Sequence, residues 1–216
     1  MAVWYVIPAR RDSKGIRYKN RRLFFFTADI LPDSEKDRVI VTTDDEEIEG
    51  YAEKYGFTCL HRSEPLSDDH ASMKDVLLDV IEKQEIDGED DIVLLYLTYP
   101  QRKWANVQKI HEFYKKNNAR TLSCALDVAD HPYLCFYELE GSRGRQVVEH
   151  SLYRRQDYPP VFRLSLFVAI FKAAEVASFS DLMLNDRTIF YKLDWNVIDI
   201  DRDTDMKNFE ADDESR

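Results

Sequence analysis

The chain has 216 residues, of which 44% are hydrophobic and 12% aromatic, enough to build one sizeable core. Its formal net charge of -11 disfavours a nucleic-acid or anionic-membrane surface, because such surfaces attract basic proteins. No apolar stretch approaches membrane-spanning length, and the short apolar start at residues 2–8 precedes positive charge instead of following it, unlike a signal peptide. We therefore expect one cytoplasmic domain over residues 1–216.

The first 126 residues alternate between two hydrophobic patterns. Apolar, β-branched runs predict strands at residues 3–7, 38–43, 57–60, 91–97 and 121–126. Apolar residues spaced by three and four predict helices at residues 46–55, 72–84 and around 107–114. This alternation predicts right-handed βαβ units, and so an α/β fold with a mostly parallel sheet.

The second part of the chain departs from this alternation. Residues 133–139 and 146–150 flank a Gly-Ser-Arg-Gly turn and predict a hairpin. Further strands are predicted at residues 162–171, 187–193 and 197–200, and the polar end at 210–216 is expected to fray. Three cysteines without a CxxC pair indicate small buried side chains rather than a disulfide framework or a metal site.

A strongly basic loop follows the first predicted strand. Residues 10–22 contain seven Lys or Arg side chains, and ligands of parallel sheets gather at the carboxyl ends of strands. Backbone amides, the Ser13 hydroxyl and fixed cations such as Arg10 and Lys14 are what a triphosphate requires. The loop lacks the GxxxxGK[ST] pattern of a Walker loop, and a solvated basic loop is the alternative interpretation.

An acidic cluster lies near the end of the chain. Asp199 and Asp201 flank Ile200, so in a strand both carboxylates would share one face while Ile200 points to the core. Two carboxylates on one face suit Mg²⁺, which prefers hard oxygen ligands. The alternative is a strand that runs into solvent with exposed aspartates.

The segment at residues 153–160 combines arginines, tyrosines and prolines. Arginine binds a carboxylate through two hydrogen bonds, so this segment is a candidate clamp for an acidic substrate. It is equally a candidate packed interface loop. The five histidines are scattered, and no nucleophilic triad is visible.

These pieces together resemble a known family. Residues 7–20, IPARRDSKGIRYKN, resemble the IPARGGSKGxxxKN signature of CMP-N-acetylneuraminic acid synthetases (acylneuraminate cytidylyltransferases). Further matching blocks follow in the same order: RVIVTTDDEEI (38–48), HRSEPLSDDHAS (61–72), LTYPQR (97–102), HPY (131–133), RRQDYPPVFR (154–163) and VIDIDRDTD (197–205). The resemblance covers nearly the whole chain.

The resemblance implies a Rossmann-like, mononucleotide-binding sheet of the nucleotide-diphospho-sugar transferase type, with a small dimerisation excursion at residues 130–158 and a homodimer. It also implies roles for individual residues. Those expected to bind the nucleotide are Arg10, Ser13, Lys14, Lys19, Asn20, Arg62, Ala71 and Ser72. Arg155 would face the sugar acid, and Asp199 and Asp201 would bind Mg²⁺.

The implied reaction joins CMP from CTP to a sialic-acid-like, 2-keto-3-deoxy sugar acid and releases pyrophosphate. Positioning and charge neutralisation carry such a transfer, so the expected catalytic residues are Arg10, Lys19 and Asp201. CTP and a small sugar acid are then the expected binding partners, with Mg²⁺ as cofactor.

This sequence departs from the family signature at several positions. Arg11 and Asp12 replace its paired glycines, Tyr96-Leu97 replaces Gln-Pro, and Tyr99 replaces a serine. The strand after Arg163 also differs, and in the family these last blocks touch the sugar. Two alternatives therefore stay open: a non-catalytic homologue that binds a nucleotide or a partner, and a transferase for another nucleotide or sugar.

Overall fold

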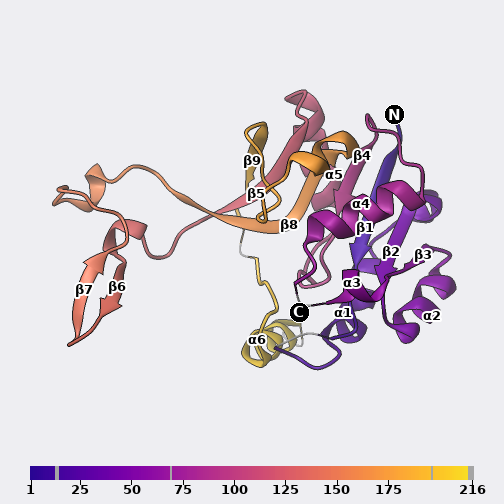
Figure 1. The fold of residues 1–216 in the computed structure, drawn as a ribbon, viewed down its shortest axis with the longest axis horizontal. Coiled ribbons are helices and arrows are strands. Elements are labelled where there is room, and N and C mark those ends of the chain that lie inside the picture. The colour runs from indigo at the N-terminus through magenta and orange to yellow at the C-terminus, as the bar shows by residue number, and fades with distance from the viewer. Residues whose placement is uncertain (13–14, 69, 196, 214–216) are drawn as a thin grey trace.

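The computed structural model describes residues 1–12, 15–68, 70–195 and 197–213, with side chains described as far as residue 209. A seven-stranded sheet with the order β3-β2-β1-β4-β8-β5-β9 forms its centre (Figure 1). The strands of this sheet are β1 (Val3–Pro8), β2 (Val39–Thr43), β3 (Thr58–His61), β4 (Asp91–Leu94), β5 (Thr121–Asp127), β8 (Phe162–Lys172) and β9 (Thr188–Lys192).

The sheet is mostly parallel, as the alternating pattern predicted. β1 pairs in parallel with β2 and β4, β2 with β3, and β5 with β9. Only β8 runs against its neighbours, and it lies between β4 and β5. The carboxyl ends of the parallel strands therefore meet at one edge, where the basic loop after β1 begins.

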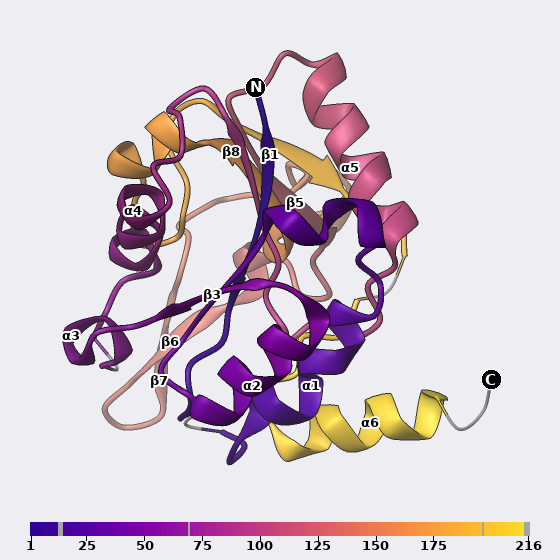
Figure 2. The same cartoon turned by 90° about the vertical axis from the view of Figure 1, so that its right-hand side faces the viewer.

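Helices cover both faces of the sheet (Figure 2). The α-helices are α1 (Lys19–Ala28), α2 (Glu46–Tyr55), α3 (Glu64–Ser67), α4 (Met73–Lys83), α5 (Trp104–Lys116) and α6 (Asp203–Asp213). Short 3-10 helices lie at Asp33–Arg38, Pro132–Leu134, Arg155–Asp157 and Ala173–Ser178. Buried residues of α1, α2, α5 and α6 pack on one face, and those of α4 and the Ala173–Ser178 turn pack on the other.

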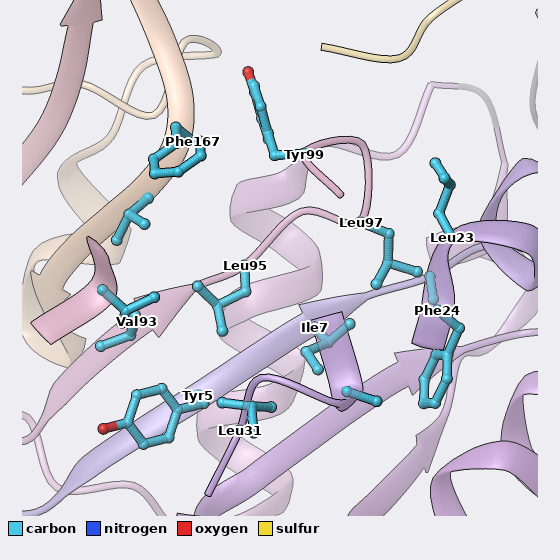
Figure 3. Close-up of a cluster of buried hydrophobic side chains, with 14 of the residues drawn as sticks. Tyr5, Ile7, Leu23, Phe24, Leu31, Val93, Leu95, Leu97, Tyr99 and Phe167 are labelled. Carbon is cyan, nitrogen blue, oxygen red and sulfur yellow. The ribbon is translucent and has the colours of Figure 1, made fainter. Parts of the chain in front are cut away.

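Alternation along the strands produces these two cores. Tyr5 and Ile7 of β1 pack with the α1 side, whereas Val6 between them packs with the α4 side. Figure 3 shows Ile7 of β1, Val93 of β4 and Phe24 of α1 within the first of these clusters. Because Ile7 is fully buried, its side chain alone contributes about 1.5–3 kcal/mol to stability.

An arm projects from the sheet between β5 and β8 (Figure 1). It carries a two-stranded antiparallel hairpin, β6 (Phe136–Leu139) and β7 (Arg143–Gln146), which confirms the predicted hairpin. The turn lies at residues 140–142 and not at 141–144, so the second strand begins earlier than the predicted 146–150. Apolar side chains on this arm, including Phe136, Tyr137 and Tyr153, are exposed. The arm coincides with the excursion expected at residues 130–158.

The predicted strand at residues 197–200 is wrong, because this segment has no regular secondary structure. It is held instead by a loop: the Ile200 amide donates to the Thr98 carbonyl at 2.9 Å, and Gln101 Nε2 donates to the Ile198 carbonyl at 3.0 Å. Ile200 is nevertheless fully buried between two aspartates that are not, as the pattern predicted. Ile200 thus points to the core as expected, without a sheet.

Candidate active site

The basic loop after β1 is anchored to the end of β2. The Ala9 amide donates to the Thr42 carbonyl at 3.0 Å, and the Thr43 hydroxyl donates to the Ala9 carbonyl. The Arg11 amide then donates to Asp44 Oδ1 at 2.7 Å. The end of β2 therefore fixes the start of the basic loop at Ala9 and Arg11.

The first turn of α1 brings Lys19 to the acidic segment. Tyr18, which precedes the helix, has a φ of 53°, and this left-handed turn directs the chain from the loop into α1. Lys19 is 7% exposed, and its Nζ donates to the Ile200 carbonyl at 2.8 Å and to Asp201 Oδ1 at 3.1 Å. The next residue, Asn20, donates from Nδ2 to the Arg10 carbonyl at 2.8 Å. The two ends of the chain thus meet at one site.

Gly15 makes this meeting possible. A Cβ atom built on Gly15 would lie 2.1 Å from the Asp201 carbonyl oxygen, a distance at which no side chain fits. The loop and the acidic segment therefore touch backbone to backbone. Gly15 is the glycine of the SKG motif in the sequence, but the motif alone does not predict this contact.

A pocket of about 420 Å³ opens where these elements converge. Cations, an amide and a carboxylate line it together: Arg10, Lys19, Asn20, Arg62 and Asp201. The remaining lining is Pro8, Gly15, Met73, Tyr96, Leu97 and Thr98. These five residues come from both ends and the middle of the sequence, and each was expected to bind the nucleotide or Mg²⁺. The fold brings them to one cavity.

Arg62 is the most deeply buried cation of this pocket. It is 4% exposed, its Nε donates to Thr42 Oγ1 at 3.1 Å, and its Nη2 is buried without a hydrogen-bond partner. Burial lowers the pKa of Arg62 to about 10, with Asp44 opposing the shift, so the guanidinium stays charged at neutral pH. A buried donor without a partner is costly, and a ligand acceptor in the pocket would satisfy it.

Asp199 lies beside this pocket, and Tyr99 holds it. The Tyr99 hydroxyl donates to Asp199 Oδ2 at 2.8 Å. Burial, and then the Asp199 charge, raise the pKa of the pocket-lining Tyr96 phenol, whereas Arg62 lowers it. Asp199 is thus within electrostatic reach of the pocket wall. Tyr99 replaces a serine of the signature, and the sequence pattern does not predict its contact with Asp199.

The donor set of Asp199 and Asp201 fits a hard divalent cation. Both carboxylates come from one short segment, and the Asp201 side chain is 70% exposed toward the pocket. Mg²⁺ keeps several waters and takes few protein carboxylates together with substrate phosphates, so two aspartates are enough. Within the described ranges no group of three or more His, Cys, Asp or Glu side chains forms a metal site, so the remaining ligands would come from substrate and water.

Other predicted site residues lie outside this pocket. The Ser72 hydroxyl caps α4 by accepting from the Asp75 amide at 3.1 Å, and Ala71 lines a neighbouring depression. Arg155 is exposed in a 3-10 turn of the projecting arm. Ser13 and Lys14 lie outside the described residues. The roles of these residues stay predictions.

The sequence of the chain matches a family model described as Cytidylyltransferase over residues 4–162. The chain belongs to the cytidylyltransferase family. Among curated relatives, it is 32% identical over 168 residues to an N-acylneuraminate cytidylyltransferase of Streptococcus agalactiae serotype V, which covers 73% of this chain. The match spans 40% of that relative's length.

A second relative matches over a larger share of its own length. The chain is 30% identical to a pseudaminic acid cytidylyltransferase of Campylobacter jejuni over 163 residues, 70% of each protein. Among solved structures, the fold matches a CMP:2-keto-3-deoxy-manno-octonic acid synthetase complexed with CTP, with a TM-score of 0.64, 13% identity and coverage of 100% and 99% of the two chains. This likeness establishes the α/β fold of nucleotidyltransferases for this cytidylyltransferase-family chain.

In the part of the chain that the structure describes, no helix has both the length and the apolar character that a bilayer crossing requires.

Proposed function

We propose that this chain transfers CMP from CTP to a 2-keto-3-deoxy sugar acid of the sialic-acid type and releases pyrophosphate. The observation that carries the proposal is the shared pocket of Arg10, Lys19, Arg62 and Asp201. A polyphosphate needs several fixed cations at a strand end, and the transfer needs carboxylates beside them. The names of the relatives support the reaction class.

The proposed mechanism relies on positioning and on charge. Arg10 and Lys19 would bind the phosphates of CTP and offset the negative charge that develops on the leaving pyrophosphate. Asn20, whose amide already fixes the Arg10 carbonyl, would keep that loop in place during the transfer. The anomeric hydroxyl of the acceptor would attack the α-phosphorus in line, so the bond to pyrophosphate breaks as the new P–O bond forms.

Asp199 and Asp201 would hold Mg²⁺, which when bound supplies positive charge at the reacting phosphate. Lys19 forms an ion pair with Asp201, so this lysine is expected to shift toward the phosphates when CTP binds. Its Nζ also donates to the Ile200 carbonyl, and this second contact keeps Lys19 at the pocket during the shift.

We propose that Arg62 recognises the donor nucleotide. Its unpartnered Nη2 donor would pair with an acceptor on the base or the ribose, and the buried position makes a wrong partner costly. Tyr96 lines the same pocket beside it. Every base and the ribose offer acceptors to this donor, so the proposal of CTP as the donor nucleotide is supported by the names of the relatives and not by Arg62 alone.

We also propose that the chain forms a homodimer through the arm at residues 130–158. The exposed apolar side chains of this arm are the support for the proposal, because a surface of this kind is usually covered by a partner. In such a dimer Arg155, which lies on the arm, would be the candidate contact to the sugar acid.

The test is a matrix of pyrophosphate-release assays that crosses CTP, UTP, GTP and ATP with several sugar acids, with and without Mg²⁺. The proposal predicts release only when CTP, Mg²⁺ and a 2-keto sugar acid are present together. Release with another nucleotide or sugar would revise the substrates and keep the reaction class. Tight CTP binding by calorimetry with no release on any acceptor would favour the non-catalytic alternative.

A further inference from the structure

The hydroxyl of Tyr99 links the Asp199 carboxylate to strand β8. Tyr99 Oη donates to Asp199 Oδ2 at 2.8 Å and accepts a hydrogen bond from the Leu166 amide at 3.2 Å. With its single proton given to the carboxylate, the hydroxyl uses a lone pair for the amide, so both contacts are satisfied at once. The direction of the donated bond is thereby fixed toward Asp199.

The ring that carries this hydroxyl is immobilised. Tyr99 is 4% exposed, and its ring meets the Phe167 ring edge to face with centroids 5.7 Å apart. The Arg102 guanidinium lies 5.8 Å from the Tyr99 ring centroid. Figure 3 shows the Tyr99 hydroxyl pointing away from the apolar cluster in which its ring begins.

Arg102 in turn fixes both elements between which Tyr99 lies. It is 2% exposed, its Nε donates to the Phe167 carbonyl of β8 at 2.8 Å, and its Nη2 donates to the Tyr96 carbonyl at 2.7 Å. Burial lowers the pKa of Arg102 to about 10, so the side chain remains a cation at neutral pH. A charged group held by carbonyls on both sides keeps the loop and the strand at a constant separation.

The same loop also fixes the backbone on either side of Asp199. Thr98 accepts from the Ile200 amide and Gln101 donates to the Ile198 carbonyl, so residues 198 and 200 are both tied to residues 98–101. The Tyr99 hydroxyl then binds the Asp199 side chain itself. Burial, and then the Asp199 charge, raise the pKa of the Tyr99 phenol, so it stays protonated and remains a donor at neutral pH.

We infer that Tyr99 is a positioning residue, whose hydrogen bond to Asp199 Oδ2 sets the orientation in which this carboxylate binds a divalent cation. The inference rests on the proposed function, since it assigns Asp199 to the cation. The signature has a serine at this position, and a serine side chain ends one bond beyond Cβ, so this contact depends on the longer phenol. Groups that orient a ligating side chain commonly change metal affinity by about 10- to 100-fold.

The test is the affinity of the full chain for Mn²⁺, measured by the electron paramagnetic resonance signal of free Mn²⁺ in the presence of CTP. The Mn²⁺ bound by CTP alone, measured in a titration without protein, is subtracted. Tyr99→Phe keeps the buried ring and removes only the hydroxyl, and we expect it to weaken Mn²⁺ binding by about tenfold or more. In the pyrophosphate-release assay, Tyr99→Phe should raise the Mg²⁺ concentration at half-maximal rate by a larger factor than it lowers kcat. The matched control is Tyr55→Phe, which removes a hydroxyl that donates to Asp29 outside the pocket, and it should leave Mn²⁺ affinity unchanged.

A double-mutant cycle separates this role from a general effect on folding. Tyr99→Phe should cost no further Mn²⁺ affinity in an Asp199→Asn background, because the carboxylate that it orients is gone. Equal Mn²⁺ affinity of wild type and Tyr99→Phe, or equal losses in both backgrounds, would overturn the inference, as would loss of the fold in Tyr99→Phe. A wild-type chain that binds no Mn²⁺ would remove the metal site and this inference together, whereas absent turnover with intact Mn²⁺ binding would contradict only the proposed reaction.

Discussion

At the scale of single residues, the candidate site depends on close contacts between parts of the chain that are distant in sequence. Gly15 touches the Asp201 backbone, and Lys19 binds both the carbonyl before Asp201 and its carboxylate. Arg62 brings a buried donor to the same pocket. Each contact is specific enough to be tested by one substitution.

Gly15→Ala should disable the site without unfolding the protein. Its Cβ would lie 2.1 Å from a backbone oxygen, so either the loop or the acidic segment has to move. Misplacement of about 1 Å costs on the order of 100-fold in rate, and we expect a loss of that size in pyrophosphate release. Gly50→Ala is the matched control, because Gly50 lies within α2 with no atom near its Cβ position, and it should raise stability by about 0.5–1 kcal/mol. Activity of Gly15→Ala equal to wild type would contradict the contact.

Arg62→Lys should weaken CTP binding by about 10- to 100-fold, since a hydrogen bond to a charged group contributes about 1.5–3 kcal/mol and lysine lacks the planar fork. Isothermal titration with CTP measures the effect. Arg38→Lys, at an exposed site that ends the 3-10 helix before β2, is the control and should bind CTP as wild type does. An unchanged Kd in Arg62→Lys would remove Arg62 from the nucleotide site.

At the scale of secondary-structure elements, the sequence predicted those with strong periodicity and missed those without it. The helix Glu46–Tyr55 was predicted with its observed bounds, because Asp45 caps it and Gly56 ends it. Helix α1 was missed: Tyr18 provides no side-chain cap, and the run of three phenylalanines shows no clear period. Of that run, Phe24 is buried, whereas Phe25 and Phe26 are exposed.

The end of the chain shows why local pattern was insufficient there. Residues 197–200 have strand-like composition, but hydrogen bonds from a loop 97 to 102 residues earlier take the place of a neighbouring strand. Such a partner cannot be read from the segment itself. The residues of the site could be predicted because the resemblance supplied them, whereas the contacts of Gly15 and Tyr99 required the fold.

Helix α6 gives a prediction at this scale. Asp205, in its first turn, accepts from the Asp201 amide at 3.0 Å and from the Arg202 amide at 2.8 Å. Asp205→Ala should destabilise this turn by about 1 kcal/mol and increase hydrogen exchange of the Asp201 and Arg202 amides, whereas Asp205→Asn keeps an acceptor and should change less. Equal exchange in both variants and wild type would contradict the cap.

The same cap should depend on pH. The Arg202 and Asp201 amides hold the pKa of Asp205 below its ordinary value of 3.8. A lowered pKa in the folded state means that the stabilisation is complete above pH 3.8 and is lost as pH falls through the folded value. The protection of the two amides against hydrogen exchange, relative to their intrinsic rates at each pH, should therefore fall in acid in wild type but not in Asp205→Asn.

At the scale of the whole molecule, one sheet presents the pocket while an arm extends away from it (Figure 1). The proposed dimer would cover the apolar side chains of that arm. Phe136→Ser combined with Leu139→Ser should therefore shift the chain from dimer to monomer in sedimentation velocity, with Leu78→Ser on α4 as the control for an exposed apolar residue elsewhere. A wild-type monomer, or a double variant that stays dimeric, would contradict an interface through the arm.

The most direct test of the central claim compares wild type and Asp201→Asn for pyrophosphate release with CTP, Mg²⁺ and a 2-keto sugar acid. Asp201 lies where the two ends of the chain meet, beside Lys19 and in the wall of the pocket. Our account predicts that wild type releases pyrophosphate and that the variant, folded by circular dichroism, releases none above background. Undiminished release by Asp201→Asn would contradict the assignment of this pocket as the site of nucleotidyl transfer.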